Sequence, residues 1–544
     1  MKSLLGKLIG KNSNSPAKLD LAWLNELTKV EGISAIEAST QKLKDYLADD
    51  SLSAADRLRA QLATDKENRP RVIRITRQFV ELQNMRPEIE NRTATTMYFY
   101  HRQVFVGYRS FIKRFLEISD DVIFTYNRLP LVLGRALQAA YAMTRWRHYS
   151  QQSVADMTWS EIFEIFSILE QESLLDLTVN LYQGEPDSHL AACFVQACML
   201  DNLGSSSLSK QQIEKVAMLL EKFIPWSKIS RHYDEHKHLY YVDLSKDSGA
   251  KRARRFEPAA SCRYWDTDQL SAKIESAIEA MDRDLPHDLN TIGDSADVLE
   301  LLVLMRSEWS RTGYIRQRRS EERKRVIKQV TVSYSFPEIA HRLKSLTQNP
   351  LGDTVGDEQN LNNRLQEHHK VMTTAADLHE EMAKERWMIS DESSSGYGVI
   401  FSEDLSSAVK LGKLVGLVVD GQPQHLIIGS IRSINKPVNG ENHIGIKIIS
   451  KQASWLQLSH ADTKPGKLKT DNINTDQLPG FSGMYLPAEQ GLSNWPSLLL
   501  PRIEYIENGV YILSQHNNTS LTQLESLIES NDDWVQVRIN YPGS

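Results

Sequence analysis

The sequence predicts an α+β multidomain protein in which a long helical region is followed by β-rich segments. Between about residues 18 and 310, apolar residues recur at helical spacing, whereas beyond about residue 325 they alternate as they do in strands. The length of 544 residues allows about three folding units of roughly 100–200 residues each. The expected order is a flexible tail (1–17), one or more helical domains (18–310), an Arg-rich linker (311–329), a β-barrel with an inserted loop and helix at about 345–386 (330–460), and a β-rich extension (461–544).

Short capping sequences mark the expected helix starts. Ser34–Glu37, Thr158–Glu161 and Ser209–Gln212 have the form in which two side chains satisfy backbone amides of a first helical turn. Apolar residues then follow at three- and four-residue intervals, and Asp266-Thr267 introduces another such run. A helical region of this kind most often supplies a partner-binding surface, so we expect an unidentified protein partner there.

The β-rich half has turn residues between short apolar runs. Strand-like alternation begins at Val326, and a polar loop and a helix around 361–386 precede several strands between 411 and 449. These strands predict a small antiparallel barrel. In the extension, Asn508-Gly509 predicts a hairpin turn because both residues tolerate positive φ. A capped helix starting at Ser520 and a strand over 534–539 are expected to follow.

Composition excludes several classes of protein. The 64 Lys and Arg against 70 Asp and Glu give a net charge of −6, which argues against a protein coated in positive charge. The three cysteines, at 193, 198 and 262, are too few for a disulfide framework and favour a reducing compartment. Cys193 and Cys198 lie in one apolar run and are expected in a helical core. We find no secretory signal and no apolar run long enough to span a membrane, so we expect a cytoplasmic protein.

A strongly basic stretch lies where the helical region ends. It spans residues 306–328 and contains nine Arg and Lys residues. Only Glu308, Glu321 and Glu322 oppose these cations, so the local excess is about six positive charges. The guanidinium group can bind phosphate oxygens or a guanine edge with two hydrogen bonds, and it can stack on a base. A solvated linker without a ligand is the alternative interpretation. The nine cationic residues are Arg306, Arg311, Arg316, Arg318, Arg319, Arg323, Lys324, Arg325 and Lys328.

A second polar motif lies downstream, within the expected barrel. Asp391, Ser393 and Gly396 have the spacing D-x-S-x-x-G, and apolar pairs flank them on both sides. This pattern predicts a strand, a turn and a second strand with polar atoms at the barrel surface. A serine-rich turn that binds nothing would show the same pattern.

The two motifs in this order resemble the PilZ domain, a bacterial receptor for cyclic di-GMP. Arg319 and Arg323 form R-x-x-x-R directly before the barrel, and D-x-S-x-x-G lies within it. The resemblance covers about residues 316–460. The remainder is similar to an atypical, multidomain, betaproteobacterial-type group of PilZ-like proteins, whose helical region contains a YW-D-T element, here Tyr264–Thr267.

This resemblance implies a fold, a ligand and residue roles. It implies a PilZ-like barrel that binds cyclic di-GMP, with Arg319 and Arg323 on phosphate or guanine groups. Arg318 and Arg325 lie close enough in sequence to take those roles in a shifted register. Asp391 would accept from guanine or orient an arginine, Ser393 would hydrogen-bond the ligand, and Gly396 would shape the turn. The implied function is a receptor that relays the nucleotide level to a protein partner.

Two further hypotheses remain open. In the first, Glu321 and Glu322 occupy the arginines, and the chain is an interaction scaffold with a degenerate barrel that needs no nucleotide. The second and weaker hypothesis is single-stranded nucleic-acid binding through the basic stretch.

No catalytic or metal site is expected. Among His232, His236 and His238, two imidazoles have the i, i+4 spacing of a possible metal pair on a helix. The fixed ligand set of a known site is missing, so we expect a solvated polar segment. We find no nucleophile–base pattern and no dinucleotide-binding fingerprint. The sequence therefore predicts a protein that is not an enzyme and carries no cofactor.

Overall fold

The computed structural model divides the chain into two compact units, Met1–Arg316 and Gln317–Ser544. The first is helical and the second is built from two closed barrels, so the α+β architecture is confirmed. None of the helices in the part that the structure describes is long and apolar enough to cross a membrane. The structure describes residues 19–540 except 31, 83–84, 117–121, 204–206, 255–256, 284, 286, 312–323, 349–385, 402–408, 421, 423–424, 438–440, 462–479 and 516–517.

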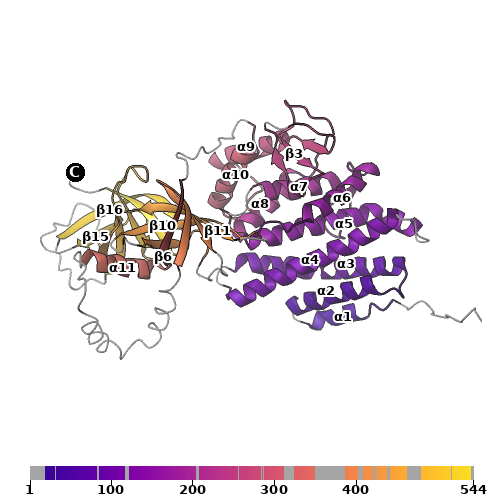
Figure 1. The fold of residues 1–544 in the computed structure, drawn as a ribbon, viewed down its shortest axis with the longest axis horizontal. Coiled ribbons are helices and arrows are strands. Elements are labelled where there is room, and N and C mark those ends of the chain that lie inside the picture. Colours follow the sequence, from indigo (N-terminus) through magenta and orange to yellow (C-terminus); the bar gives the residue numbers. More distant parts are fainter. Residues whose placement is uncertain are drawn as a thin grey trace, which may run out of the picture. The chain divides into compact units, whose positions relative to one another are not determined.

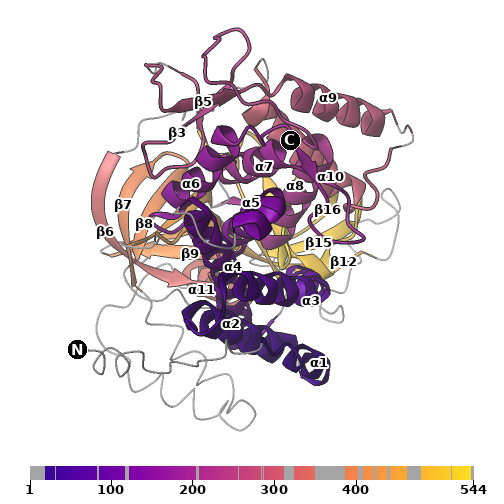
Figure 2. The same ribbon diagram turned by 90° about the vertical axis from the view of Figure 1, so that its right-hand side faces the viewer.

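The helical unit is a stack of helices with one continuous apolar core. The two long helices α4 and α5 pack along each other near the middle of the stack (Figure 1). The helices α1 and α2 lie at one end, and α9, α10 and a small sheet of β3, β4 and β5 lie at the other end (Figure 2). The helices are α1 (Trp23–Glu26), α2 (Gly32–Ala48), α3 (Ala54–Glu81), α4 (Pro87–Leu116), α5 (Val122–Tyr149), α6 (Thr158–Gln171), α7 (Leu190–Asn202), α8 (Lys210–Phe223), α9 (Asp268–Asp282) and α10 (Ser295–Trp309). The short strands are β1 (Thr178–Val179), β2 (Ser188–His189), β3 (Tyr240–Asp243), β4 (Lys251–Arg252) and β5 (Cys262–Trp265).

The helix α7 is buried on all sides in this core. Every residue from Leu190 to Leu200 is buried, as expected for a helix that is apolar on all sides. Cys193 and Cys198 are therefore core residues, and Cys262 is buried as well. Burial raises the pKa of the Cys193 thiol to about 11. The predicted packing role of the helical cysteine pair is confirmed.

Of the three predicted helix caps, one is confirmed. Ser209 and Gln212 exchange both hydrogen bonds of a capping box at the start of α8. Ser34 instead lies inside α2, which begins at Gly32. Thr158 is the first helical residue of α6, and Asp247 caps this helix from a distant loop by accepting from the amides of Met157 and Ser160. A cap supplied from outside the local sequence leaves no local pattern to find.

The first barrel contains six antiparallel strands in the closed order β10-β11-β8-β7-β6-β9. Its strands are β6 (Lys324–Ser333), β7 (Arg386–Ser393), β8 (Gly396–Phe401), β9 (Leu414–Val419), β10 (Leu426–Asn435) and β11 (Asn442–Ser450). The strand β6 begins earlier than the sequence indicates, so residues 324–329 of the expected linker are part of this strand. Lys324, Arg325, Lys328 and Gln329 pair with β7, and a register shift lies between Arg325 and Lys328. The expected helix over 361–386 falls outside the described residues apart from Arg386, which opens β7.

The second barrel is also closed, in the order β12-β13-β14-β17-β16-β15. It starts at Ser454, so residues 454–460 belong to it and not to the first barrel. The predicted hairpin at Asn508-Gly509 is wrong: Asn508 has the expected positive φ of 55°, but the flanking strands β14 and β15 do not pair. The strands of the second barrel are β12 (Ser454–His460), β13 (Phe481–Leu486), β14 (Ser497–Pro501), β15 (Val510–Gln515), β16 (Asn518–Ser530) and β17 (Trp534–Asn540).

The predicted capped helix from Ser520 is also wrong, because this segment is the strand β16. It pairs with β15 on one side and with β17 on the other. Register shifts on both sides of Leu527 interrupt the inward–outward alternation, so that Leu524 is buried while Leu527 and Ile528 are half-exposed. The spacing of Leu524, Leu527 and Ile528, which resembles that of a helix, coincides with these bulges in a strand.

A helix that the sequence analysis misses joins the two barrels. The helix α11 (Phe336–Gln348) follows Ser335, whose hydroxyl accepts from the Glu338 amide. Its apolar residues Phe336, Ile339 and Leu343 share one core cluster with β9, β10 and β11 of the first barrel and β13, β14 and β17 of the second. In Figure 1 this helix lies along the lower side of the barrels. The two barrels therefore form one packed unit.

Candidate functional site

The D-x-S-x-x-G motif forms a tight hairpin at one end of the first barrel. Asp391 and Ser393 lie at the end of β7, Ser394 and Ser395 form the turn, and Gly396 begins β8. Ser393 and Gly396 are directly opposite each other, and the Ser393 hydroxyl donates to the Gly396 carbonyl at 3.2 Å. The predicted strand, turn and strand are confirmed.

The strand β6 brings the end of the basic stretch to this hairpin. Lys324 lies opposite Glu392, and Arg325 lies opposite Asp391. The side chain of Arg325 is exposed, and that of Asp391 is half-buried. Two residues that are 66 positions apart in the chain therefore place a guanidinium group and a carboxylate on neighbouring strands. Arg318, Arg319 and Arg323 lie outside the described residues.

Two glycines of β8 lie beside the hairpin residues. Gly396 and Gly398 alternate on one face of β8, opposite Ser393 and Asp391 of β7. A Cβ atom at Gly398 would lie 2.2 Å from Asp391 Oδ2, so the carboxylate rests directly on the glycine. A Cβ atom at Gly396 would lie 2.8 Å from the backbone carbonyl of Ile446 on β11. The motif glycine is therefore required by the close approach of a neighbouring strand.

The row of opposed residues continues onto β11. Gly398 is paired with Gly445, and Gly396 is paired with Lys447. Directly opposed residues of antiparallel strands point to the same face of the sheet. Arg325 and Asp391 on one side, and Lys447 on the other, thus border a strip of glycines on the outer face of the barrel.

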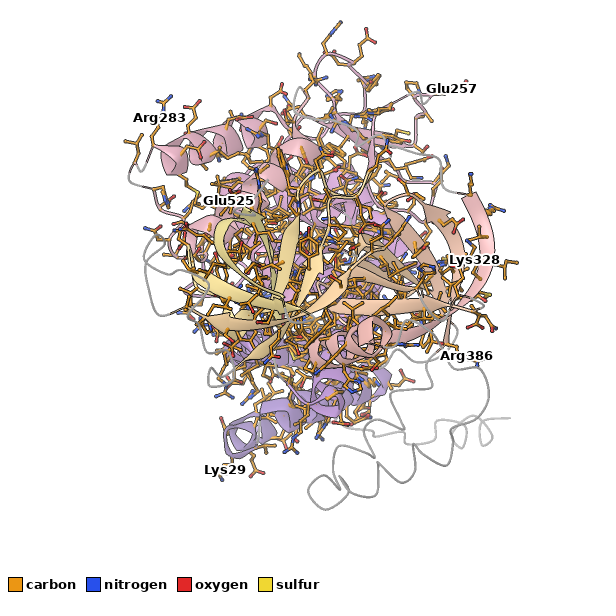
Figure 3. The ribbon with its side chains drawn as sticks, turned by 90° about the vertical axis from the view of Figure 1, so that its left-hand side faces the viewer. Lys29, Glu257, Arg283, Lys328, Arg386 and Glu525 are labelled. Atoms are coloured by element: carbon orange, nitrogen blue, oxygen red, sulfur yellow. The ribbon has the colours of Figure 1, made fainter. Side chains whose placement is uncertain are left out.

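Several of the charges around the hairpin are paired within the protein. Lys328 Nζ contacts Glu392 Oε2 at 2.6 Å, and both side chains are partly exposed. An exposed ion pair of this kind stabilises a fold by about 0–1 kcal/mol, so a competing anion displaces it at small cost. Figure 3 shows Lys328 and Arg386 on the outer side of the first barrel. Burial, and in smaller part the charge of Glu392, raises the pKa of Tyr397, which lies in the core below.

A loop of the second barrel reaches the hairpin. Between β13 and β14, Glu489 accepts from the Ser450 hydroxyl and from the amides of Lys451 and Gln452, which ties this loop to the end of β11. A Cβ atom at Gly491 would lie 3.9 Å from Ser394. The motif turn thus has a neighbour from the second barrel that the sequence analysis does not anticipate.

The other candidate residues have structural partners. His238 Nδ1 accepts from the Asp234 amide, and the described part of the chain holds no group of three His, Cys, Asp or Glu residues suited to a metal ion. In the YW-D-T element, Tyr264 and Trp265 are buried, and Thr267 Oγ1 donates to the carbonyl of Trp309 at 2.6 Å. This element fixes the end of α10.

Gly398, Gly445 and Lys447 are site residues that the two sequence motifs do not include. The available signal was the alternation of glycine with apolar residues in G-Y-G-V and I-G-I-K. Alternate glycines in a strand indicate a close approach of backbone or ligand on one face. Their position opposite each other depends on strand register, which a single sequence does not show.

Comparison with known proteins adds one finding. Residues 18–234 match the family model described as "Cyclic-di-GMP receptor FimW, N-terminal domain". The matched part is about two fifths of the chain and lies wholly within the helical unit. Neither the curated proteins nor the solved structures contain a match. The match supports a relation of this chain to a cyclic di-GMP receptor family.

Proposed function

We propose that this protein is a cyclic di-GMP receptor and that the nucleotide binds on the outer face of the first barrel, beside the D-x-S-x-x-G hairpin. The observation that carries the proposal is the placement of Arg325 directly opposite Asp391, with Ser393 two residues further along the same strand. The similarity of residues 18–234 to the N-terminal domain of a cyclic di-GMP receptor supports it independently.

The chemistry of the ligand fits these groups. Cyclic di-GMP carries two phosphates, which guanidinium groups bind with paired hydrogen bonds. Its guanine N–H groups need acceptors, and a carboxylate such as Asp391 accepts strongly. Ser393 supplies a hydroxyl on the same face of the sheet. In this proposal the barrel is PilZ-like, Arg319 and Arg323 supply further phosphate and guanine contacts, and the protein has no catalytic role.

The connection between the two units offers a route by which nucleotide binding at the barrel affects the helical unit. Residues 311–323 join the helical unit to β6, so a ligand held by both the arginines of this segment and the barrel favours some arrangements of the two units over others. A nucleotide with different affinities for these arrangements shifts their populations. A protein partner that binds the helical unit in only some of these arrangements then responds to the nucleotide level.

Calorimetric titration of the full chain with cyclic di-GMP tests the proposal. Arg325→Ala and Asp391→Ala each remove one charge-assisted contact, worth about 1.5–3 kcal/mol, and should weaken binding about 10- to 100-fold. Arg386→Ala is the matched control, because Arg386 is an exposed arginine at the opposite end of β7, and it should bind as the wild type does. Absence of binding to the wild-type chain at micromolar nucleotide, or unchanged binding in both site variants, would refute the proposal.

A second candidate is an interaction scaffold that needs no nucleotide. The ion pairs Lys328–Glu392 and Lys447–Glu529 favour it, because they neutralise cations around the hairpin without a ligand. It predicts a partner that co-purifies equally with and without cyclic di-GMP. A partner whose capture depends on the nucleotide would exclude it.

A further inference from the structure

We propose that Lys447 is an additional phosphate-binding residue and that Glu529 of the second barrel controls its availability. This inference rests on the proposed function, but it concerns residues outside both sequence motifs. Lys447 lies on β11 directly opposite Gly396, and half of its side chain (51%) is exposed to solvent. The motif glycine thus has a cation beside it that comes from a different hairpin.

The strand register places Lys447 on the same face as Ser393. Ser393, Gly396 and Lys447 form one row across β7, β8 and β11. Neighbouring strands are about 4.8 Å apart, so the backbones of Ser393 and Lys447 are separated by roughly 10 Å. Because Gly396 has no side chain, nothing from this position stands between the serine hydroxyl and the lysine. A phosphate bound over the glycine is within reach of both.

The counter-ion of Lys447 comes from the second barrel. Glu529, on β16, accepts from Lys447 Nζ at 3.3 Å, and it also pairs with Arg432 of β10 at shorter range. The Asn531 side-chain amide donates to its other oxygen at 3.0 Å. Only 13% of the Glu529 side chain is exposed. Glu529 therefore keeps two partners when Lys447 leaves it.

The release of Lys447 is consequently inexpensive, and its capture by a phosphate is favourable. Lys447 is half-exposed and regains water when it leaves, and Glu529 keeps the charge of Arg432 beside it, so little stability is lost. Phosphate carries a full negative charge and bonds an ammonium group strongly. Phosphate and Glu529 thus compete for one lysine, and nucleotide binding removes the ion pair by which Lys447 joins β11 to the second barrel. The second barrel is thereby coupled to the state of the site.

Two variants that should change the affinity for cyclic di-GMP in opposite directions test the inference, by calorimetry on the full chain. Lys447→Met keeps the length of the side chain but removes its charge, and it should weaken cyclic di-GMP binding about tenfold and reduce its salt dependence. Glu529→Gln removes the competing carboxylate and should tighten binding severalfold. Lys451→Met, an exposed lysine four residues further on, is the matched control and should bind as the wild type does. Thermal unfolding of each variant checks that the fold is intact.

The outcomes separate this inference from the proposed function. If the wild-type chain binds and Asp391→Ala does not, an unchanged affinity in Lys447→Met overturns the role of Lys447 alone. A Glu529→Gln variant that is folded and binds more weakly than the wild type overturns the competition. If the wild-type chain binds no cyclic di-GMP, both the proposed function and this inference are overturned.

Discussion

The two glycines of β8 give opposite predictions when each is changed to alanine. A Cβ atom at Gly398 would meet the Asp391 carboxylate at 2.2 Å from Oδ2 and 2.6 Å from Cγ, whereas one at Gly396 would meet the backbone carbonyl of Ile446 at 2.8 Å. A carboxylate at the end of a side chain can rotate away. A carbonyl in a closed barrel moves only if two paired strands move with it.

The expected magnitudes follow from these distances. Gly396→Ala should destabilise the β unit by about 1–2 kcal/mol, because overpacking costs about 1–3 kcal/mol and alanine recovers about 0.5–1 kcal/mol of backbone entropy. Gly398→Ala should leave stability within about 1 kcal/mol of the wild type. It moves the Asp391 carboxylate by more than 1 Å and should weaken nucleotide binding about tenfold or more, like Asp391→Ala.

Urea denaturation followed by tryptophan fluorescence measures stability, because Trp387 lies in the core of the first barrel. Calorimetric titration with cyclic di-GMP measures binding in the same preparations. A folded Gly398→Ala variant that binds as tightly as the wild type would show that nucleotide binding does not depend on the position of the Asp391 carboxylate. A Gly396→Ala variant as stable as the wild type would show that the Ile446 carbonyl does not exclude a side chain at position 396.

Two predictions concern the helical unit. Burial lowers the pKa of His101 from 6.5 to about 3, so the unfolded chain takes up a proton that the folded chain does not, and stability should fall as the pH falls below 6.5. Between pH 6.5 and 5 the loss should be about 2 kcal/mol in urea denaturation, and a His101→Phe variant that keeps the full slope would contradict this assignment. Thr267→Val removes the buried hydrogen bond to the Trp309 carbonyl and should cost about 1–2 kcal/mol, whereas Asp266→Asn at the exposed neighbouring position should cost almost nothing. Equal unfolding midpoints for these last two variants would show that the hydrogen bond is unimportant.

Local patterns predicted the features whose causes are local. The apolar run around Cys193 and Cys198 indicated a buried helix, and α7 is one. The box at Ser209 formed as predicted because both of its hydrogen bonds close within one turn. The D-x-S-x-x-G spacing predicted a hairpin because the turn and both flanking apolar pairs lie within a dozen residues.

Other features depend on contacts between distant segments, and these were missed or mistaken. Asp247 caps α6 from 90 residues away, and β16 is a strand because β15 and β17 provide hydrogen-bonding partners on both of its edges. At the site, Arg325 faces Asp391 and Lys447 faces Gly396 only in the register of the closed barrel. A shift of one residue would turn each of these side chains to the opposite face. The sequence therefore determines which charged and polar groups this protein has and how they are spaced along the chain. Only the closed barrel decides which of them share a surface, because the pairing register depends on two strands together.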